Sequence, residues 1–90
     1  MSSSRKIVFS AQANDDLLFW GKNKPENVEK INSLLHSILL DPEGGIGKPE
    51  PLRFMHSGYW SRRISHKERM IYRWDEKVIE IISLRGHYDS

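Results

Sequence analysis

Residues 47–72 read GKPEPLRFMHSGYWSRRISHKERMIY, and this stretch determines most of the fold and chemistry that the sequence predicts. From Trp60 onward apolar and polar residues alternate, which predicts half-buried antiparallel strands. Six Lys or Arg residues and one acidic residue lie between Arg53 and Arg73, whereas the rest of the chain holds eight basic and eleven acidic residues. A cationic segment on an acidic body is typical of a surface that binds a polyanion. A solvated charged hairpin would have the same composition, so charge alone leaves both interpretations open.

Length and composition predict one domain over residues 1–90. A chain of 90 residues has room for a single contiguous core. With 38% hydrophobic and 29% charged residues the chain is an ordinary soluble one, and its apolar runs are far too short to span a membrane. It contains no cysteine, which excludes a disulfide framework and agrees with a reducing cytoplasmic location. No secretion signal is visible, and we expect residues 1–5 to form a disordered tail.

One strand and two helices are predicted in the first half of the chain. Lys6–Phe9 is a short β-rich run, and Ser10 is suited to cap a helix that ends near Gly21. Pro25 is suited to the first turn of a second helix, which stops at residues 41–42. The second helix carries an apolar stripe made of Val28, Ile31, Leu34, Leu35, Ile38 and Leu39. Such a stripe favours a core-facing helix over a cofactor site, because a helix that covers a sheet needs an apolar face.

The second half of the chain predicts an antiparallel meander of three strands. Residues 60–65 and 69–74 alternate between apolar and polar, and a short turn separates them. Residues 78–84 are nearly all apolar, which predicts a strand that lies inside the sheet. Together with the two helices, the meander predicts an α+β domain.

The length of the hairpin loop decides which arginines share a face of the sheet. Side chains directly opposite each other in an antiparallel pair lie on the same face. A three-residue loop pairs Ser65 with Arg69 and Arg63 with Ile71. The residues that this register places on the open face are Arg63, Arg69 and Arg73. Those that it turns toward the helices are Trp60, Ile64, Met70, Tyr72 and Trp74. Arg62 is turned the same way, and we expect it to snorkel to the surface or to lie beyond the cover of the helices.

Glu50 and His87 are the candidate reactive groups beside this arginine face. Glu50 lies in a loop over residues 43–51 with a proline on each side, so we expect its carboxylate to be held still. His87 follows the last strand and is itself followed by Tyr88. Each of these residue types is common on protein surfaces, so only their combination with the arginines indicates chemistry.

A carboxylate, an imidazole and arginines together can cleave RNA without a metal. A base removes the 2′-OH proton, an acid protonates the leaving 5′-oxygen, and guanidinium groups stabilise the charge of the transition state. The four histidines lie on separate predicted elements without the spacing of metal ligands. We therefore expect neither a metal nor another cofactor.

Four blocks of the sequence resemble the YoeB/Txe family of bacterial toxins, and the resemblance covers nearly the whole chain. The blocks are Gly47–Leu52, Ser57–Ile64, Arg69–Tyr72 and His87–Tyr88. The resemblance implies a RelE-like α+β fold, in which two N-terminal helices pack on one face of a mostly antiparallel sheet of four to five strands. It also implies a ribosome-dependent mRNA endoribonuclease, or mRNA interferase, that cuts the codon in the A site and inhibits translation.

The resemblance implies a role for each matching residue. Glu50 would be the general base, Arg69 the arginine that stabilises the transition state, and His87 the general acid. Tyr88 would orient the substrate nucleotide. The residues from which we expect further contacts to the substrate are Arg63, Arg62, Arg73 and Lys48.

The resemblance also implies partners. A cognate antitoxin of the YefM/Axe type would neutralise the arginine face with an acidic, partly disordered segment. The ribosome and mRNA would be the other partners, operator DNA would be bound only through the antitoxin complex, and a homodimer is a further option.

Two other functions stay open at this point. One is a non-catalytic inhibitor of the same fold, such as the gyrase-poisoning toxins. The other is an RNA-binding module, which would need base-stacking aromatic residues on the open face, whereas Trp60, Tyr72 and Trp74 are expected to point away from it.

Overall fold

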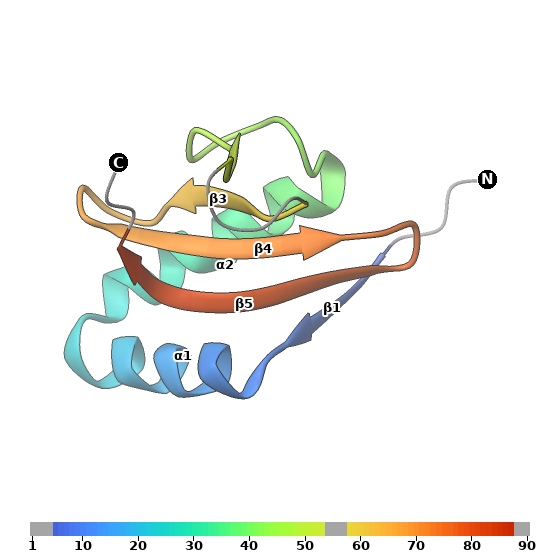
Figure 1. The fold of residues 1–90 in the computed structure, drawn as a ribbon. Helices are drawn as coiled ribbons and strands as arrows, with labels where there is room; N and C mark the ends of the chain where they lie inside the picture. The colour runs from blue at the N-terminus through green and yellow to red at the C-terminus, as the bar shows by residue number, and fades with distance from the viewer. Residues whose placement is uncertain (1–4, 54–57, 88–90) are drawn as a thin grey trace.

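Two helices cover one face of a five-stranded mixed sheet (Figure 1). The computed structural model describes residues 5–53 and 58–87, with His87 described for its backbone only. The elements are β1 (Lys6–Phe9), α1 (Ala11–Asn23), α2 (Pro25–Leu40), β2 (Glu50–Pro51), β3 (Trp60–Arg63), β4 (Glu68–Trp74) and β5 (Val78–His87). The strand order is β1-β5-β4-β3-β2, with β1 parallel to β5 and the other pairs antiparallel. The predicted α+β architecture and the interior place of the last strand are therefore confirmed.

Both helices begin as the sequence predicts. The Ser10 hydroxyl accepts a hydrogen bond of 3.0 Å from the Ala13 N–H at the start of α1 and donates one of 2.7 Å to the Ile82 carbonyl of β5. Pro25 occupies the first turn of α2, where its missing N–H costs no helical hydrogen bond. Helix α1 continues past Gly21 to Asn23, so its end was predicted two residues too early.

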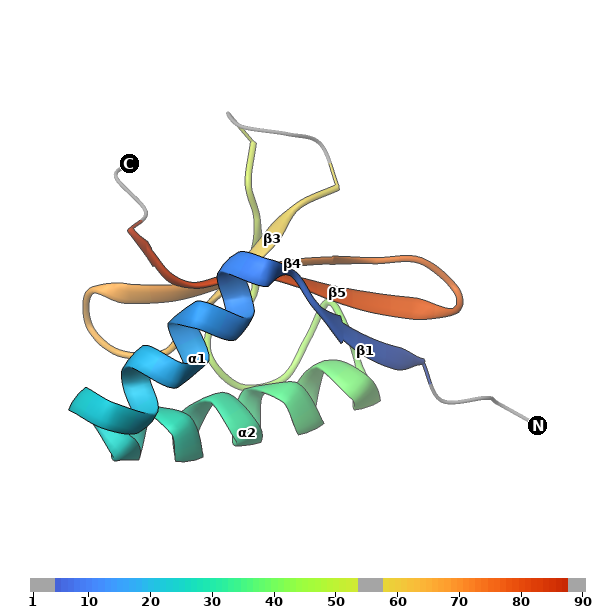
Figure 2. The same cartoon turned by 90° about the horizontal axis from the view of Figure 1, so that it is seen from below.

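The core lies between the helices and the inner face of the sheet. Figure 2 shows α1 and α2 on the same side of the strands. The fully buried apolar side chains include Ile31, Leu34 and Ile38 of α2, Met70 and Tyr72 of β4, and Ile79, Ile81 and Leu84 of β5. Trp60 and Trp74 are half-buried at the margin of this core, with ring centroids 5.3 Å apart. The predicted sorting of side chains between the two faces is thus confirmed.

The loop of the β3–β4 hairpin is two residues longer than predicted. Arg63 lies opposite Arg69, and Ser61 lies opposite Ile71. The Ile64 N–H donates to the Glu68 carbonyl at 2.9 Å and closes the turn. A shift of two residues keeps every side chain on its face, because the side-chain period of a strand is two. The predicted pairs were wrong, but the face that carries the arginines was right.

Two segments that were predicted to be irregular make defined hydrogen bonds to strands or turns of the sheet. Glu50 and Pro51, expected in a loop, form the edge strand β2, where a proline is tolerated because its missing N–H faces no neighbour. Arg5, expected in a disordered tail, donates a hydrogen bond of 2.7 Å from Nε to the Asp75 carbonyl. The remainder of the predicted tail, residues 1–4, lies outside the described residues.

Helix α1 fixes the end of β5 through the backbone of one residue. The Asp16 carboxylate accepts a hydrogen bond of 2.9 Å from the Leu84 N–H, and the Trp20 indole N–H donates one of 2.8 Å to the Leu84 carbonyl. Asp16 and Trp20 are only 3% and 6% exposed, so these bonds are shielded from water. They hold the strand three residues before His87.

We expect Asp16→Ala to lower the free energy of unfolding by about 1–3 kcal/mol, because the buried Leu84 N–H would lose its acceptor. Urea unfolding measures this change, and hydrogen exchange should show faster exchange of the Leu84 amide. Asp15→Ala removes the same charge from the exposed neighbour and should change the free energy by less than about 0.5 kcal/mol. Equal effects of the two substitutions would contradict this role of Asp16.

No helix in the described ranges 5–53 and 58–87 combines the length and the apolar composition that crossing a membrane requires.

Candidate active site

Two rows of paired residues bring predicted catalytic side chains to one face of the sheet. In the first row Glu50 of β2 lies opposite Ser61 of β3. In the second row Arg63 of β3 lies opposite Arg69 of β4, which lies opposite Gly86 of β5. Residues that pair across strands, or lie two apart on one strand, share a face. Glu50, Arg63 and Arg69 therefore project together from the face that the helices leave open.

The spacing of these rows suits a phosphodiester placed between them. Glu50 and Arg69 are two strands apart, which corresponds to about 10 Å across the sheet and about 7 Å along it. A carboxylate and a long guanidinium side chain can both reach a group held in that gap. Strands position these residues, so the geometry is more rigid than a loop would make it.

Three buried polar atoms without a partner among the described residues lie on this face, and two others, Asn27 Nδ2 and Glu68 Oε1, lie elsewhere. Arg69 Nε and Nη1 and the Ser61 hydroxyl are shielded from solvent and have no hydrogen-bond partner among the described residues. Buried polar groups in proteins are nearly always paired, so these groups are suited to hydrogen bonds with a bound molecule. The guanidinium of Arg69 is thus suited to an anion that would lie beside Glu50 and Arg63. The sequence indicated the face of Ser61 but no role for it.

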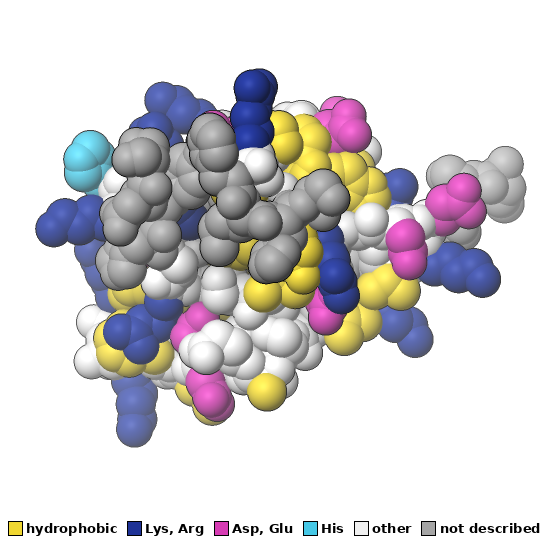
Figure 3. All heavy atoms as spheres, in the orientation of Figure 1, with side chains coloured by type: hydrophobic (Ala, Val, Ile, Leu, Met, Phe, Trp, Pro, Cys, Tyr) yellow, Lys and Arg dark blue, Asp and Glu magenta, His cyan; other side chains and the backbone are white. Residues whose placement is uncertain are grey.

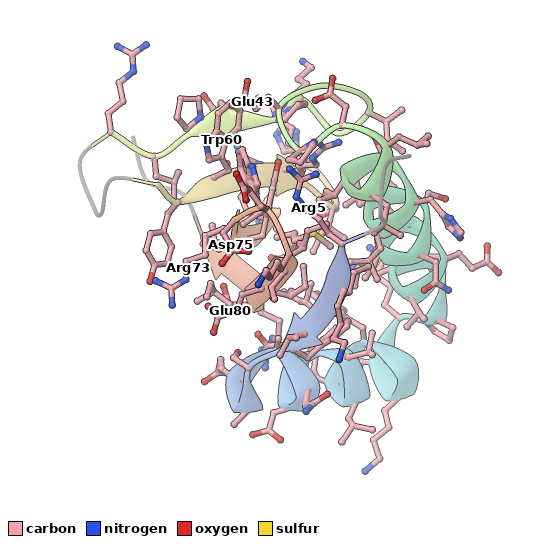
Figure 4. The ribbon with its side chains drawn as sticks, turned by 90° about the vertical axis from the view of Figure 1, so that its right-hand side faces the viewer. Arg5, Glu43, Trp60, Arg73, Asp75 and Glu80 are labelled. Carbon is pink, nitrogen blue, oxygen red and sulfur yellow. The ribbon has the colours of Figure 1, made fainter. Side chains whose placement is uncertain are left out.

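Arg73 lies on the same face but at a distance. It lies four positions after Arg69 on β4, about 13 Å along the strand. Its Nε donates to Glu80 Oε1 at 2.7 Å, and its guanidinium carbon lies 5.3 Å from the centroid of the Tyr59 ring. The hydrogen bond and the charge of Glu80 raise the pKa of Arg73. Figure 4 shows Arg73 and Glu80 beside one another, near the turn that holds Asp75. Glu80 offsets the charge that Arg73 was expected to offer to a substrate.

The predicted substrate contact of Arg62 is wrong, because the structure buries this side chain completely. Its five N–H donors make five hydrogen bonds of 2.6–2.9 Å. The acceptors are the hydroxyls of Ser37 and Tyr72 and the carbonyls of Asp41, Gly44 and Ile46. Arg62 neither snorkels nor lies beyond the helices. It binds the connection between α2 and β2 to the sheet, and that connection leads to Glu50.

Tyr72 completes this buried network. Its hydroxyl accepts from Arg62 Nε at 2.9 Å and donates to the Pro42 carbonyl at 2.7 Å. Burial raises the pKa of Tyr72, and the neighbouring guanidinium only partly opposes this effect. The phenol therefore stays neutral and keeps its donor role at ordinary pH.

The remaining predicted site residues are Lys48, His87 and Tyr88. Lys48 is exposed, two residues before Glu50, and has a backbone φ of 52°. The backbone of His87 pairs with Glu68, directly after the pair of Gly86 with Arg69. The His87 side chain and the whole of Tyr88 lie outside the described residues, so the meeting of the proposed acid with the proposed base stays a prediction.

A family model for the YoeB-like toxin of bacterial type II toxin–antitoxin systems matches residues 9–88. The chain belongs to the YoeB-like toxin family. Toxin YoeB of Synechocystis is 43% identical over 83 residues, which cover 92% of this chain and 96% of that relative. The YoeB dimer from Staphylococcus aureus superposes with a TM-score of 0.89 at 42% identity, covering 96% of this chain and 100% of that one. The YoeB–YefM complex from the same organism gives a TM-score of 0.83 at 42% identity, with the same coverage.

These similarities confirm the predicted family and the RelE-like fold. This YoeB-like chain is thus a toxin of a type II toxin–antitoxin system. The described residues contain no group of three or more His, Cys, Asp or Glu side chains that could hold a metal ion.

Proposed function

We propose that this YoeB-like toxin is an endoribonuclease that cuts mRNA in the ribosomal A site and thereby inhibits translation in the cytoplasm. The observation that carries the proposal is the guanidinium of Arg69, whose buried Nε and Nη1 have no partner among the described residues. It lies in the rows that also contain Glu50 and Arg63. A phosphate oxygen is the acceptor that such a guanidinium matches best.

The proposed reaction is attack of a ribose 2′-oxygen on the adjacent phosphate. Glu50 removes the 2′-OH proton, and Arg69 and Arg63 stabilise the negative charge that develops on the phosphoryl oxygens. His87 protonates the 5′-oxygen as its bond to phosphorus breaks, and Tyr88 orients the nucleotide. The products are a 2′,3′-cyclic phosphate on one fragment and a 5′-hydroxyl on the other. No step in this scheme requires a metal ion.

The proposed partners follow from the same surface and from relatives. The S. aureus structures contain YoeB with YefM and a YoeB dimer. We propose a YefM-like antitoxin for this chain, with an acidic segment that covers Arg63 and Arg69, and operator DNA binding only through that complex. A homodimer is proposed from the S. aureus dimer. Lys48, next to Glu50, and Arg73, farther along β4, would contribute long-range attraction for RNA.

A purified translation reaction tests the proposed function. With this protein present, primer extension on a translated mRNA should show new 5′ ends within A-site codons, and polynucleotide kinase should label those ends directly because they carry a 5′-hydroxyl. Omitting ribosomes should greatly reduce cleavage. Arrested translation on intact mRNA would instead support the non-catalytic inhibitor, and ends that carry a 5′-phosphate would contradict attack by the 2′-oxygen.

A further inference from the structure

A basic pocket lies beside the candidate active site, where the β3–β4 hairpin meets α2. It has a volume of about 410 Å³. Its lining residues are Lys30 of α2, Gly47 and Lys48 before β2, and Arg63, Ile64, Ser65 and His66 of the hairpin. Figure 3 shows dark-blue Lys and Arg side chains gathered at its left side, over the end of the molecule that carries this hairpin.

The charge of this basic pocket is uniformly positive. Three lining side chains carry a positive charge, namely Lys30, Lys48 and Arg63, and the imidazole of His66 lies in the same lining. None of the described residues that line the pocket is acidic. The hollow on the other side of the hairpin differs, because Glu68 lines it together with two lysines. Of these two pockets, the basic pocket is the one suited to an anion, since its described lining has no carboxylate.

The wall of the basic pocket is held rigidly. The Arg63 N–H donates a hydrogen bond of 2.7 Å to the Gly47 carbonyl and joins the connection to β3. Arg62 donates hydrogen bonds to the carbonyls of Gly44 and Ile46, which precede Gly47 in the same connection. Lys48 follows with a φ of 52°, a left-handed conformation that is strained for a lysine. Strained residues that their surroundings hold in place occur preferentially at ligand sites.

The lining favours a phosphate over a peptide. Ile64 is the one apolar side chain among the described lining residues apart from the aliphatic stems of the cations, so little apolar surface is offered to a protein segment. No Phe, Tyr or Trp from the described residues lines the pocket, so a base has no ring on which to stack. Lysine and arginine contacts to phosphates position a nucleic acid strand without reading its sequence.

We propose that the basic pocket holds an mRNA backbone phosphate adjacent to the scissile one. The proposal rests on the proposed function and extends it. Arg63 connects the two sites, because it pairs with Arg69 in the active-site row and also lines the pocket. An RNA strand that passes over Arg63 is bound at two phosphates. These two contacts fix the register of the RNA relative to Glu50 and Arg69. Lys30 and His66 are thus assigned to RNA binding.

RNA binding with variants of the two new residues tests the proposal. The parent protein carries Glu50→Gln so that the probe, a fluorescent single-stranded RNA oligonucleotide, stays intact. Adding Lys30→Ala and His66→Ala should weaken binding at low salt roughly tenfold. It should also reduce the slope of log affinity against log salt by about 0.7, the value for one lost phosphate contact on a single strand. Both side chains are exposed, so the fold should be kept.

A matched pair of substitutions elsewhere is the control. Lys77→Ala with His36→Ala removes the same residue types from exposed positions that do not line the basic pocket, and it should leave the salt slope unchanged. The proposal would be overturned if both pairs of substitutions weakened RNA binding equally. It would also be overturned if Lys30→Ala with His66→Ala weakened the binding of an oligoglutamate peptide as much as that of RNA. Either result would show a general effect of charge. A parent protein that does not bind the oligonucleotide at low salt would also overturn the proposal.

Ribosomes without mRNA form the second arm of the experiment. A loss confined to ribosome binding would assign the pocket to ribosomal RNA and overturn an mRNA site. Failure of the proposed function appears separately, as intact mRNA in the translation reaction with the unmodified protein. Binding of the oligonucleotide tests the phosphate site in the basic pocket whether or not the unmodified protein cleaves mRNA.

Discussion

Replacing Glu50 by glutamine is expected to lower the rate of mRNA cleavage by about 10²–10⁴-fold, the usual contribution of a general base. Glutamine keeps the shape of the side chain but cannot take a proton from the 2′-OH. Glu50 is exposed on the two-residue edge strand β2, so the free energy of unfolding should change little. Single-turnover cleavage on programmed ribosomes isolates the chemical step, and ribosome binding measured beside it separates catalysis from recruitment.

Glu43→Gln is the matched control for this substitution. Glu43 is an exposed carboxylate in the connection that leads from α2 to β2, and the change removes the same charge. Cleavage by this variant should stay close to that of the unmodified toxin. If Glu50→Gln cleaved within tenfold of the unmodified toxin, Glu50 would not be the general base.

Arg62→Met is expected to lower the free energy of unfolding by about 3–5 kcal/mol. Methionine removes all five donors and leaves three carbonyls and two hydroxyls without them. Each buried acceptor without a partner costs about 1–3 kcal/mol, and those near the surface regain water, so the total is smaller than the sum. Urea unfolding at one protein concentration measures the change, because a dimer would make the midpoint depend on concentration.

Arg63→Met tests whether this loss belongs to the buried network. Arg63 is the next residue on β3 and is only half-buried, so its replacement should change the free energy of unfolding by less than about 1 kcal/mol. Equal stability of the two variants would show that the Arg62 hydrogen bonds contribute little. Arg62→Lys, which keeps the charge but not the planar fork, should lie between the parent and Arg62→Met.

Local sequence patterns predicted most of the fold. The error in the hairpin register did not change the predicted face of any side chain, because it was an even number of residues. The helices follow from their apolar spacing and from Ser10 and Pro25, which act within a few residues. The hairpin pairs were wrong by two residues, yet Arg63 and Arg69 were placed on the correct face. A displacement by one residue would have exchanged the faces of the whole strand.

Arg62 shows where sequence patterns reach their limit. The two-residue period of the strand correctly predicted that Arg62 faces the helices. It could not predict the burial of the side chain, because the neighbouring Arg63 carries the same charge and differs from Arg62 only in its surroundings. The acceptors of Arg62 lie 10 to 25 residues away, and most of them are backbone carbonyls, which leave no signal in the sequence. No sequence pattern indicated a role for Asp16 or Lys30 either, because each gains its role from a segment distant in the chain.

The sequence by itself determined the family, the α+β class and the face of the sheet that carries Arg63 and Arg69, because these depend on residue type and on short periods along one strand. Only the tertiary structure decided that Glu50 stands on an edge strand opposite Ser61, that Arg62 is a buried tether and that Lys30 joins Arg63 around a basic pocket. The physical reason is that pairing register, burial and hydrogen-bond partners are set when distant segments pack together, and no local pattern encodes which segments will meet.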